Sequence, residues 1–114
     1  MTEREVESGI GVAPEMKDTL TRLQEEYFLT RGEAFKACVA LALSMNLERV
    51  EPAKVDRTWH AGAAMQDVLD LVFLATGSNT PAREATVLGH TALAYVQDQL
   101  DAEKPFKAIF GLAN

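Results

Sequence analysis

Residues 12–45 read VAPEMKDTLTRLQEEYFLTRGEAFKACVALALSM, and this stretch predicts two helices joined by a tight corner. In its first half, apolar residues recur at intervals of four, three and four, which is the spacing that lines one face of a helix. Pro14 suits the first turn of this helix, because a missing N–H costs nothing there. The apolar residues of the expected amphipathic helix are Met16, Leu20, Leu23 and Tyr27.

The corner and the second helix follow. Thr30 is a good N-cap, and Glu33 three residues later completes a capping box. The helix carries Phe35, Val39 and Leu43 on one face, and alanine and leucine make much of its remaining surface apolar. Because a helix that is apolar nearly all round must be covered from several sides, other helices or a second subunit are expected to cover it. Phe35, Val39 and Leu43 are the predicted oligomer interface.

The middle of the chain predicts a loop and a third helix. Residues 46–56 contain Pro52 and alternating charges, which is typical of a loop. The third helix is expected to begin near Thr58, and Gly77 suits its C-terminal cap. Its expected apolar stripe consists of Met65, Val68, Leu69, Val72 and Phe73.

The last part predicts one long helix and one short helix. Thr80 followed by Pro81 is a strong signal for a helix start, and this fourth helix is expected to run to about residue 101. Residues 106–112 follow Pro105 and predict a short apolar helix. The residues expected to face inward from the fourth helix are Ala85, Leu88, Ala92, Tyr95, Val96 and Leu100.

These patterns predict the all-α class, as a compact bundle of four main helices plus a short C-terminal helix. Residues 10–12 are compatible with a short N-terminal strand or an extended arm, although Gly9 and Gly11 weaken a strand. Residues 1–9 are acidic and are expected to be mobile. Residues 10–114 are therefore expected to form a single helical domain.

Composition narrows the function classes. The chain has 114 residues, a hydrophobic content of 47% and a net charge of −6. Its acidity argues against broad, non-specific nucleic-acid binding, which needs clustered Lys and Arg, but leaves room for a local basic patch. Its N-terminus has no apolar segment typical of a signal peptide, and no apolar run is long enough to span a bilayer. We therefore expect a cytoplasmic protein that does not bind or span a membrane.

The sequence predicts no catalytic site, metal or cofactor, because no known catalytic motif is present and its one cysteine and two histidines are scattered. Apolar neighbours are expected to raise the pKa of Cys38 and give it a structural role. His90 is expected to be a satisfied interface or surface residue. An enzyme remains the low-ranked alternative, and it would use Trp59, His60, Asp67 and Asp70.

Basic residues gather around the predicted corner. Helix N-termini offer free N–H groups and a positive dipole end to phosphate, so a phosphate-binding corner is physically reasonable. Four or five such contacts would bind weakly and with strong salt dependence. The residues predicted to touch a DNA backbone are Lys17, Thr30, Arg31, Gly32 and Lys36.

Residues 17–46 resemble the start of the DndE family of DNA sulfur-modification proteins, small helical accessory proteins of bacterial phosphorothioation systems. The resemblance rests on Leu20 and Leu23, then Phe28-Leu29-Thr30-Arg31 at the corner, then Ala40-Leu41-Ala42-Leu43-Ser44 at the end of the second helix. It implies a helical oligomer with affinity for DNA through surface basic residues.

Residues 10–46 are also similar in spacing to ribbon-helix-helix proteins, which read the major groove with an N-terminal strand paired across a dimer. Here the candidate strand, Ile10-Gly11-Val12, carries no Lys, Arg, Asn or Gln to read bases. This resemblance implies a transcriptional regulator as an alternative function.

The function expected from these patterns is that of a non-enzymatic accessory protein of a bacterial DNA modification or defence system. It would form a homo-oligomer through the second helix and contact duplex DNA or a larger protein of the same system. The alternative from another class is an adaptor or inhibitor subunit, which would dock a larger partner through its acidic surface and apolar tail. The predicted docking residues of that tail are Phe106, Ile109 and Phe110.

Overall fold

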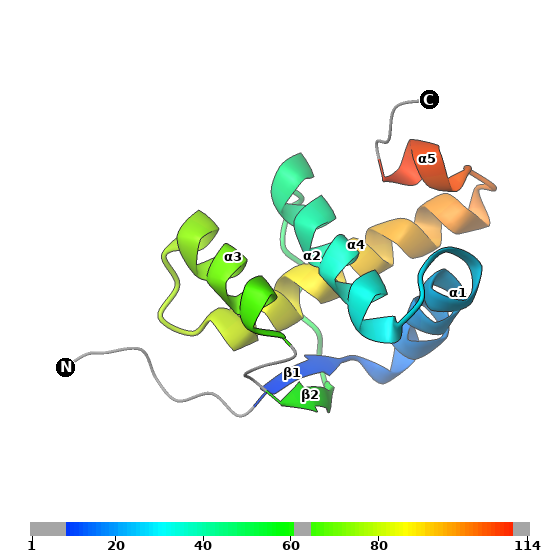
Figure 1. Cartoon of the computed structure of the whole chain (residues 1–114). Helices are drawn as coiled ribbons and strands as arrows, with labels where there is room; N and C mark the ends of the chain where they lie inside the picture. The colour runs from blue at the N-terminus through cyan, green and yellow to red at the C-terminus, as the bar shows by residue number, and fades with distance from the viewer. Residues whose placement is uncertain (1–8, 61–64, 111–114) are drawn as a thin grey trace.

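A computed structural model describes residues 9–60 and 65–110, whose helices gather around one long helix (Figure 1). The fold is mostly helical with one small antiparallel sheet, so the all-α prediction is right for most of the chain and misses the sheet. In chain order the elements are β1 (Gly9–Val12), the 3-10 turn η1 (Pro14–Met16), α1 (Lys17–Tyr27), α2 (Arg31–Met45), β2 (Asp56–His60), α3 (Gln66–Thr76), α4 (Pro81–Asp101) and α5 (Phe106–Ile109).

Helix α4 is the centre of the fold. In Figure 1 it runs behind α2, and α1, α2, α3 and β1 all pack against it. Residues 85–93 of α4 are buried without exception, so this stretch is covered on every side. The residues expected to face inward are buried, apart from Tyr95, which is half-buried.

The crossing of α2 and α4 depends on Gly89. A Cβ atom at this position would collide with the ring of Phe35, so the glycine lets the ring lie directly against the α4 backbone. Phe35 is fully buried, and the ring of Trp59 from β2 packs on it at a centroid distance of 5.0 Å. One aromatic side chain thus joins α2, α4 and the sheet.

The small sheet corrects the prediction of a helix near Thr58. Strand β1, which was expected as a strand or an arm, pairs antiparallel with β2, with Ile10 opposite Trp59 and Gly11 opposite Arg57. Ile10 and Gly11 are adjacent on β1, but their partners are two residues apart on β2. Thr58 is therefore the extra residue of a β-bulge. Residues 56–60 therefore supply the backbone partners of β1, and α3 begins only at Gln66.

The strand is also fixed to α4. The Gly11 amide donates to Thr86 Oγ1 over 3.1 Å, and this hydroxyl donates to the Ala82 carbonyl over 2.9 Å. Because a buried amide without a partner is costly, this contact satisfies β1 on the side that β2 does not reach. The sheet is therefore held against the N-terminal half of α4.

Most predicted helix ends are confirmed. Thr30 and Glu33 form both bonds of the capping box at the start of α2, and α4 begins at Pro81. Gly77 ends α3 with a φ of 70°, a left-handed conformation that glycine adopts without strain. Residues 1–8 lie outside the described residues, while Gly9, expected to be mobile, belongs to β1.

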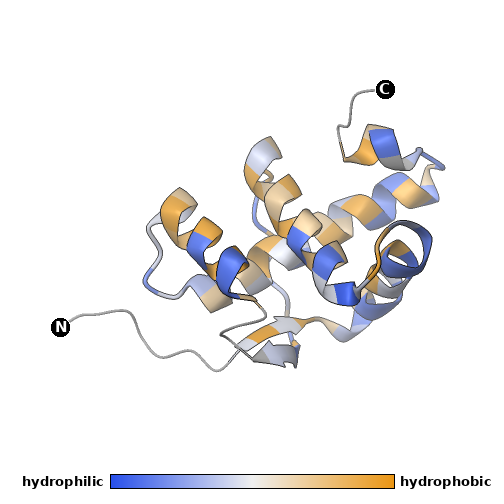
Figure 2. Cartoon of the chain, in the orientation of Figure 1, coloured by the Kyte–Doolittle hydropathy of each residue, from blue (hydrophilic) through white to orange (hydrophobic). Residues whose placement is uncertain are grey.

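The predicted oligomer interface on α2 is wrong in its main residues. Phe35 and Val39 are both 0% exposed within the single chain, and Leu43 is half-buried against the same core. The apolar face of α2 is thus covered by the chain itself and is closed to a second copy. The exposed large apolar residues include three on α3, whose C-terminal half is hydrophobic (Figure 2). They are Leu71, Leu74 and Phe73, the last of which was expected to face inward.

The predicted docking tail is also part of the chain's own core. Ile109 of α5 is 2% exposed, and Phe110 is half-buried. The Phe110 ring meets Phe28 edge-on, with centroids 6.2 Å apart and an interplanar angle of 67°. Ile109 and Phe110 are therefore engaged within the chain, and the side chain of Phe106 lies outside the described residues.

Replacing Gly89 tests the central contact. Gly89→Ala should lower the free energy of unfolding by about 1–3 kcal/mol, because the overpacked Phe35 ring must shift. This loss should occur even though alanine favours a helix over glycine by about 1 kcal/mol. Urea unfolding followed by circular dichroism measures the change.

The matched control is Gly32→Ala in α2, where the nearest side-chain atom to an added Cβ atom would be Met65 Cε, at 3.6 Å. It should leave stability unchanged or raise it by up to about 1 kcal/mol. The double variant Phe35→Leu, Gly89→Ala should be more stable than the sum of the two single changes predicts, because the smaller side chain relieves the collision. Equal effects of alanine at the two glycines would contradict the proposed contact.

Candidate functional site

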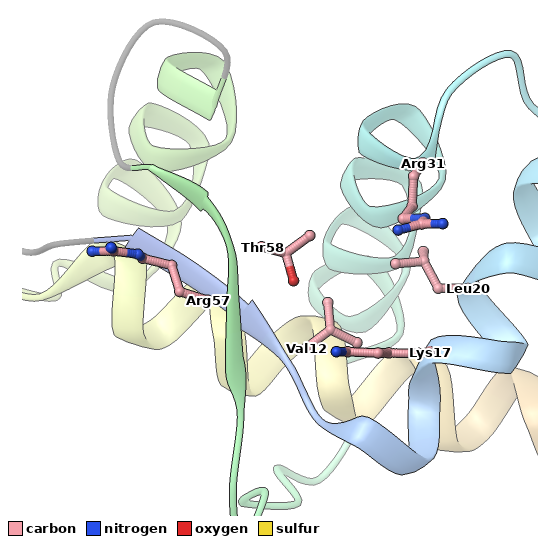
Figure 3. Close-up of a pocket in the computed structure, with 6 residues that line it drawn as sticks. All are labelled: Val12, Lys17, Leu20, Arg31, Arg57 and Thr58. Atoms are coloured by element: carbon pink, nitrogen blue, oxygen red, sulfur yellow. The ribbon is translucent and has the colours of Figure 1, made fainter.

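A pocket of about 280 Å³ lies where the sheet meets the starts of α1 and α2. Val12 and Leu20 give it an apolar wall, and three basic side chains and one hydroxyl complete its lining. Figure 3 shows the pocket in close-up, with its residues Val12, Lys17, Leu20, Arg31, Arg57 and Thr58.

Local structure explains how these residues meet. Lys17 is the first residue of α1 and Arg31 is the first residue of α2, so each side chain leaves the start of a helix. Thr58 lines the same space from the bulge of β2. In Figure 3 the polar ends of Lys17, Arg31 and Thr58 surround one space, whereas the guanidinium of Arg57 points away from it. Arg57 therefore lines the pocket with its stem.

The two cations inside the pocket are in different electrostatic states. Lys17 Nζ lies 2.8 Å from Asp56 Oδ2, and this hydrogen bond and the lysine charge hold the pKa of Asp56 below its usual value. Asp56 thus stays ionised through neutral and mildly acidic pH and neutralises part of the lysine charge. Arg31 is exposed and forms no ion pair with any residue in the described ranges 9–60 and 65–110. Arg31 is therefore the less compensated cation of the pocket.

The structure divides the set of residues predicted to touch DNA. Lys17 and Arg31 meet in the pocket, whereas Lys36 lies outside its lining and pairs with Asp67 at 3.2 Å. Thr30 Oγ1 accepts the Glu33 amide over 3.1 Å, so this hydroxyl is used in the cap. Gly32, within α2, is not part of the pocket lining either.

The corner is less open to an anion than the sequence predicts. The Glu33 carboxylate accepts the amides of Leu29 and Thr30 at 3.2 and 3.3 Å, and Thr30 Oγ1 accepts the Glu33 amide, so three donors of the corner are used and a negative charge lies beside them. An anion at this end of α2 therefore depends on the Arg31 side chain more than on the backbone.

Arg57 and Thr58 are not among the site residues predicted from the sequence, because its pattern indicates a loop up to residue 56 and a helix from about residue 58. The alternation of Asp56, Thr58 and His60 with Arg57 and Trp59, including one β-branched and one aromatic residue, is a strand signal that was present. The strand is short, however, and its residues line the pocket only because it pairs with β1, more than 40 residues earlier in the chain.

Three residues of the enzymatic alternative each have a partner of their own in the described part of the chain. Trp59 packs on Phe35, Asp67 binds Lys36, and Asp70 accepts a bond from Gln66 at 2.8 Å. Lys36 also lowers the pKa of Asp67 through their hydrogen bond. The side chain of His60 lies outside the described residues.

His90 and Cys38 are both core residues. His90 is 7% exposed, and its Nδ1 has no hydrogen-bond partner among the described residues, whereas a satisfied residue was expected. Cys38 is fully buried, and burial raises the pKa of its thiol to about 12. In the described part of the chain, no three His, Cys, Asp or Glu residues are grouped as metal ligands, and no helix is long and apolar enough to cross a membrane.

Comparison with known proteins gives no match for this chain. No protein-family model matches it, and neither does any curated protein or solved structure. The function proposed below therefore rests on the structure of the pocket.

The buried thiol gives a direct chemical test. At pH 8 a thiol with a pKa of about 12 is roughly 10⁻⁴ ionised, so native Cys38 should resist iodoacetamide and react only after unfolding. Ser44→Cys places a second thiol at an exposed position of α2 as the matched control. Mass spectrometry should show one label on the native variant and two in denaturant. Rapid double labelling of the native variant would contradict the burial of Cys38.

Proposed function

We propose that this chain is a non-enzymatic accessory protein of a bacterial DNA modification or defence system, and that its pocket receives a phosphate group of DNA. The observation that carries the proposal is the meeting of Lys17, Arg31 and Thr58 around one concave space. An ammonium and a guanidinium are donors that commonly contact phosphate oxygens. The Thr58 hydroxyl bounds the same space and donates to the Asp56 carbonyl over 3.1 Å. The resemblance of residues 17–46 to DndE proteins favours DNA as the source of that phosphate.

The charges set the strength of this contact. The chain carries a net charge of −6, and Asp56 offsets one of the two cations inside the pocket. With one phosphate neutralised in the pocket, the logarithm of the binding constant should fall with the logarithm of salt concentration at a slope of about −0.9. Such binding is weak, so the protein positions itself on DNA and does not read its sequence.

An oligomer would multiply this weak contact, because several linked pockets bind one duplex with avidity. Since the apolar face of α2 is buried, self-association would have to use another surface. Leu71 and Leu74 of α3 are exposed apolar residues that such a surface could use. Light scattering on the purified protein measures its mass in solution, and a monomer at high concentration would contradict this part of the proposal.

Removing the charge of Arg31 tests the pocket. Arg31→Gln should weaken binding to a labelled duplex and reduce the salt slope by about 0.9, because one cation is lost. Fluorescence anisotropy at about 0.05 and about 0.2 M salt measures both quantities. Lys104→Gln, which removes an exposed cation outside the pocket lining, is the matched control and should leave the slope unchanged. Identical losses in the two variants would indicate diffuse attraction and refute the pocket.

Removing the competing carboxylate should have the opposite effect. Asp56→Asn takes away the anion that holds Lys17, so affinity for the same duplex should rise by up to about fivefold. Asp101→Asn makes the same change in net charge at an exposed position near the end of α4, outside the pocket lining. If both variants gained affinity equally, net charge alone would explain the gain and the role of Lys17 would be rejected.

A further inference from the structure

A second pocket, which shares no residue with the first, lies between α4 and the segment of residues 47–50. Its volume is about 250 Å³, below the roughly 300–1,000 Å³ of typical small-molecule sites. Leu47, Val50 and Ala94 give it an apolar lining, and Tyr95 adds an aromatic ring. The space suits one long side chain of a partner better than a free metabolite.

The carboxylates of Glu48 and Asp98 complete the lining of this pocket. Both residues are exposed, and neither forms an ion pair with another residue in the described ranges. Arg49, the basic residue next to Glu48 in the chain, is engaged by Glu84. The pocket therefore combines an apolar interior with two uncompensated negative charges.

The segment that forms one wall is already fixed in place. The Val50 amide donates to Thr91 Oγ1 over 2.8 Å, and this hydroxyl donates to the Val87 carbonyl over 2.8 Å. At its other end, the Leu47 amide donates to the Ala42 carbonyl over 3.0 Å at the end of α2. Because both ends are held by α2 and α4, a ligand would not have to order this wall on binding.

From this combination we infer that the pocket receives an arginine side chain from a basic segment of a partner protein. The stem of an arginine would lie on Leu47, Val50 and Ala94, and its guanidinium would pair with Glu48 and Asp98. A guanidinium also stacks on aromatic rings, which Tyr95 offers, and this favours arginine over lysine. The inference concerns a protein partner and does not depend on the phosphate pocket.

The test uses a short peptide with one central arginine between glycine and serine residues, titrated into the full ¹⁵N-labelled chain. We expect amide shifts to concentrate at residues 47–50 and 91–98, with a dissociation constant on the order of millimolar. The same peptide with citrulline, which keeps the shape and lacks the charge, should bind at least about threefold more weakly. Equal binding of the two peptides would overturn the inference, as would shifts spread over the whole acidic surface.

Two variants complete the test. Glu48→Gln with Asp98→Asn should weaken binding of the arginine peptide by about threefold to tenfold, since two exposed ion pairs are lost. Both changes are at exposed side chains, and an otherwise unchanged amide spectrum verifies the fold. Glu15→Gln with Glu25→Gln removes two negative charges at exposed positions outside the pocket lining, so it is the matched control and should bind as the unaltered chain does. Retained affinity in the double variant would overturn the inference.

Discussion

The contact of the Phe35 ring with the α4 backbone at Gly89 is the constraint on which the rest of the structure depends. It sets how closely α2 approaches the central helix, and Trp59 packs on the same ring from the sheet. Through this one side chain, the position of α2 determines where Arg31 leaves the start of its helix, and the position of β2 determines where Thr58 lies. The packing of the core and the geometry of the phosphate pocket are therefore not separable.

The pocket exists because distant segments meet. The bulge that leaves Thr58 unpaired lies beside the partners of β1, and the Gly11 amide joins β1 to α4. A buried amide of β1 without a partner would be costly, and Thr86 Oγ1 accepts the Gly11 amide and removes that cost. The two cations of the site differ in charge compensation, because Asp56 pairs with Lys17 and leaves Arg31 as the less compensated charge.

The sequence predicts a helix start or end correctly where residues within one turn determine it. The capping box at Thr30, the start of α4 at Pro81 and the end of α3 at Gly77 all follow from residues within one turn. The short strand β2 failed as a prediction because its stability comes from pairing with β1, which no local pattern reports. For the same reason the site was predicted only in part: Lys17 and Arg31 are visible as basic residues at helix starts, while their junction with Thr58 depends on tertiary structure.

The central position of α4 has a consequence for how the protein is made. Strand β1 and helices α1, α2 and α3 all precede α4 in the chain, yet each packs against it. During synthesis on a ribosome, these elements must wait for their common partner, with their apolar faces uncovered. Folding should therefore occur as one late, cooperative event and not segment by segment. A chain that stops before α4 would lack the helix against which all of these elements pack.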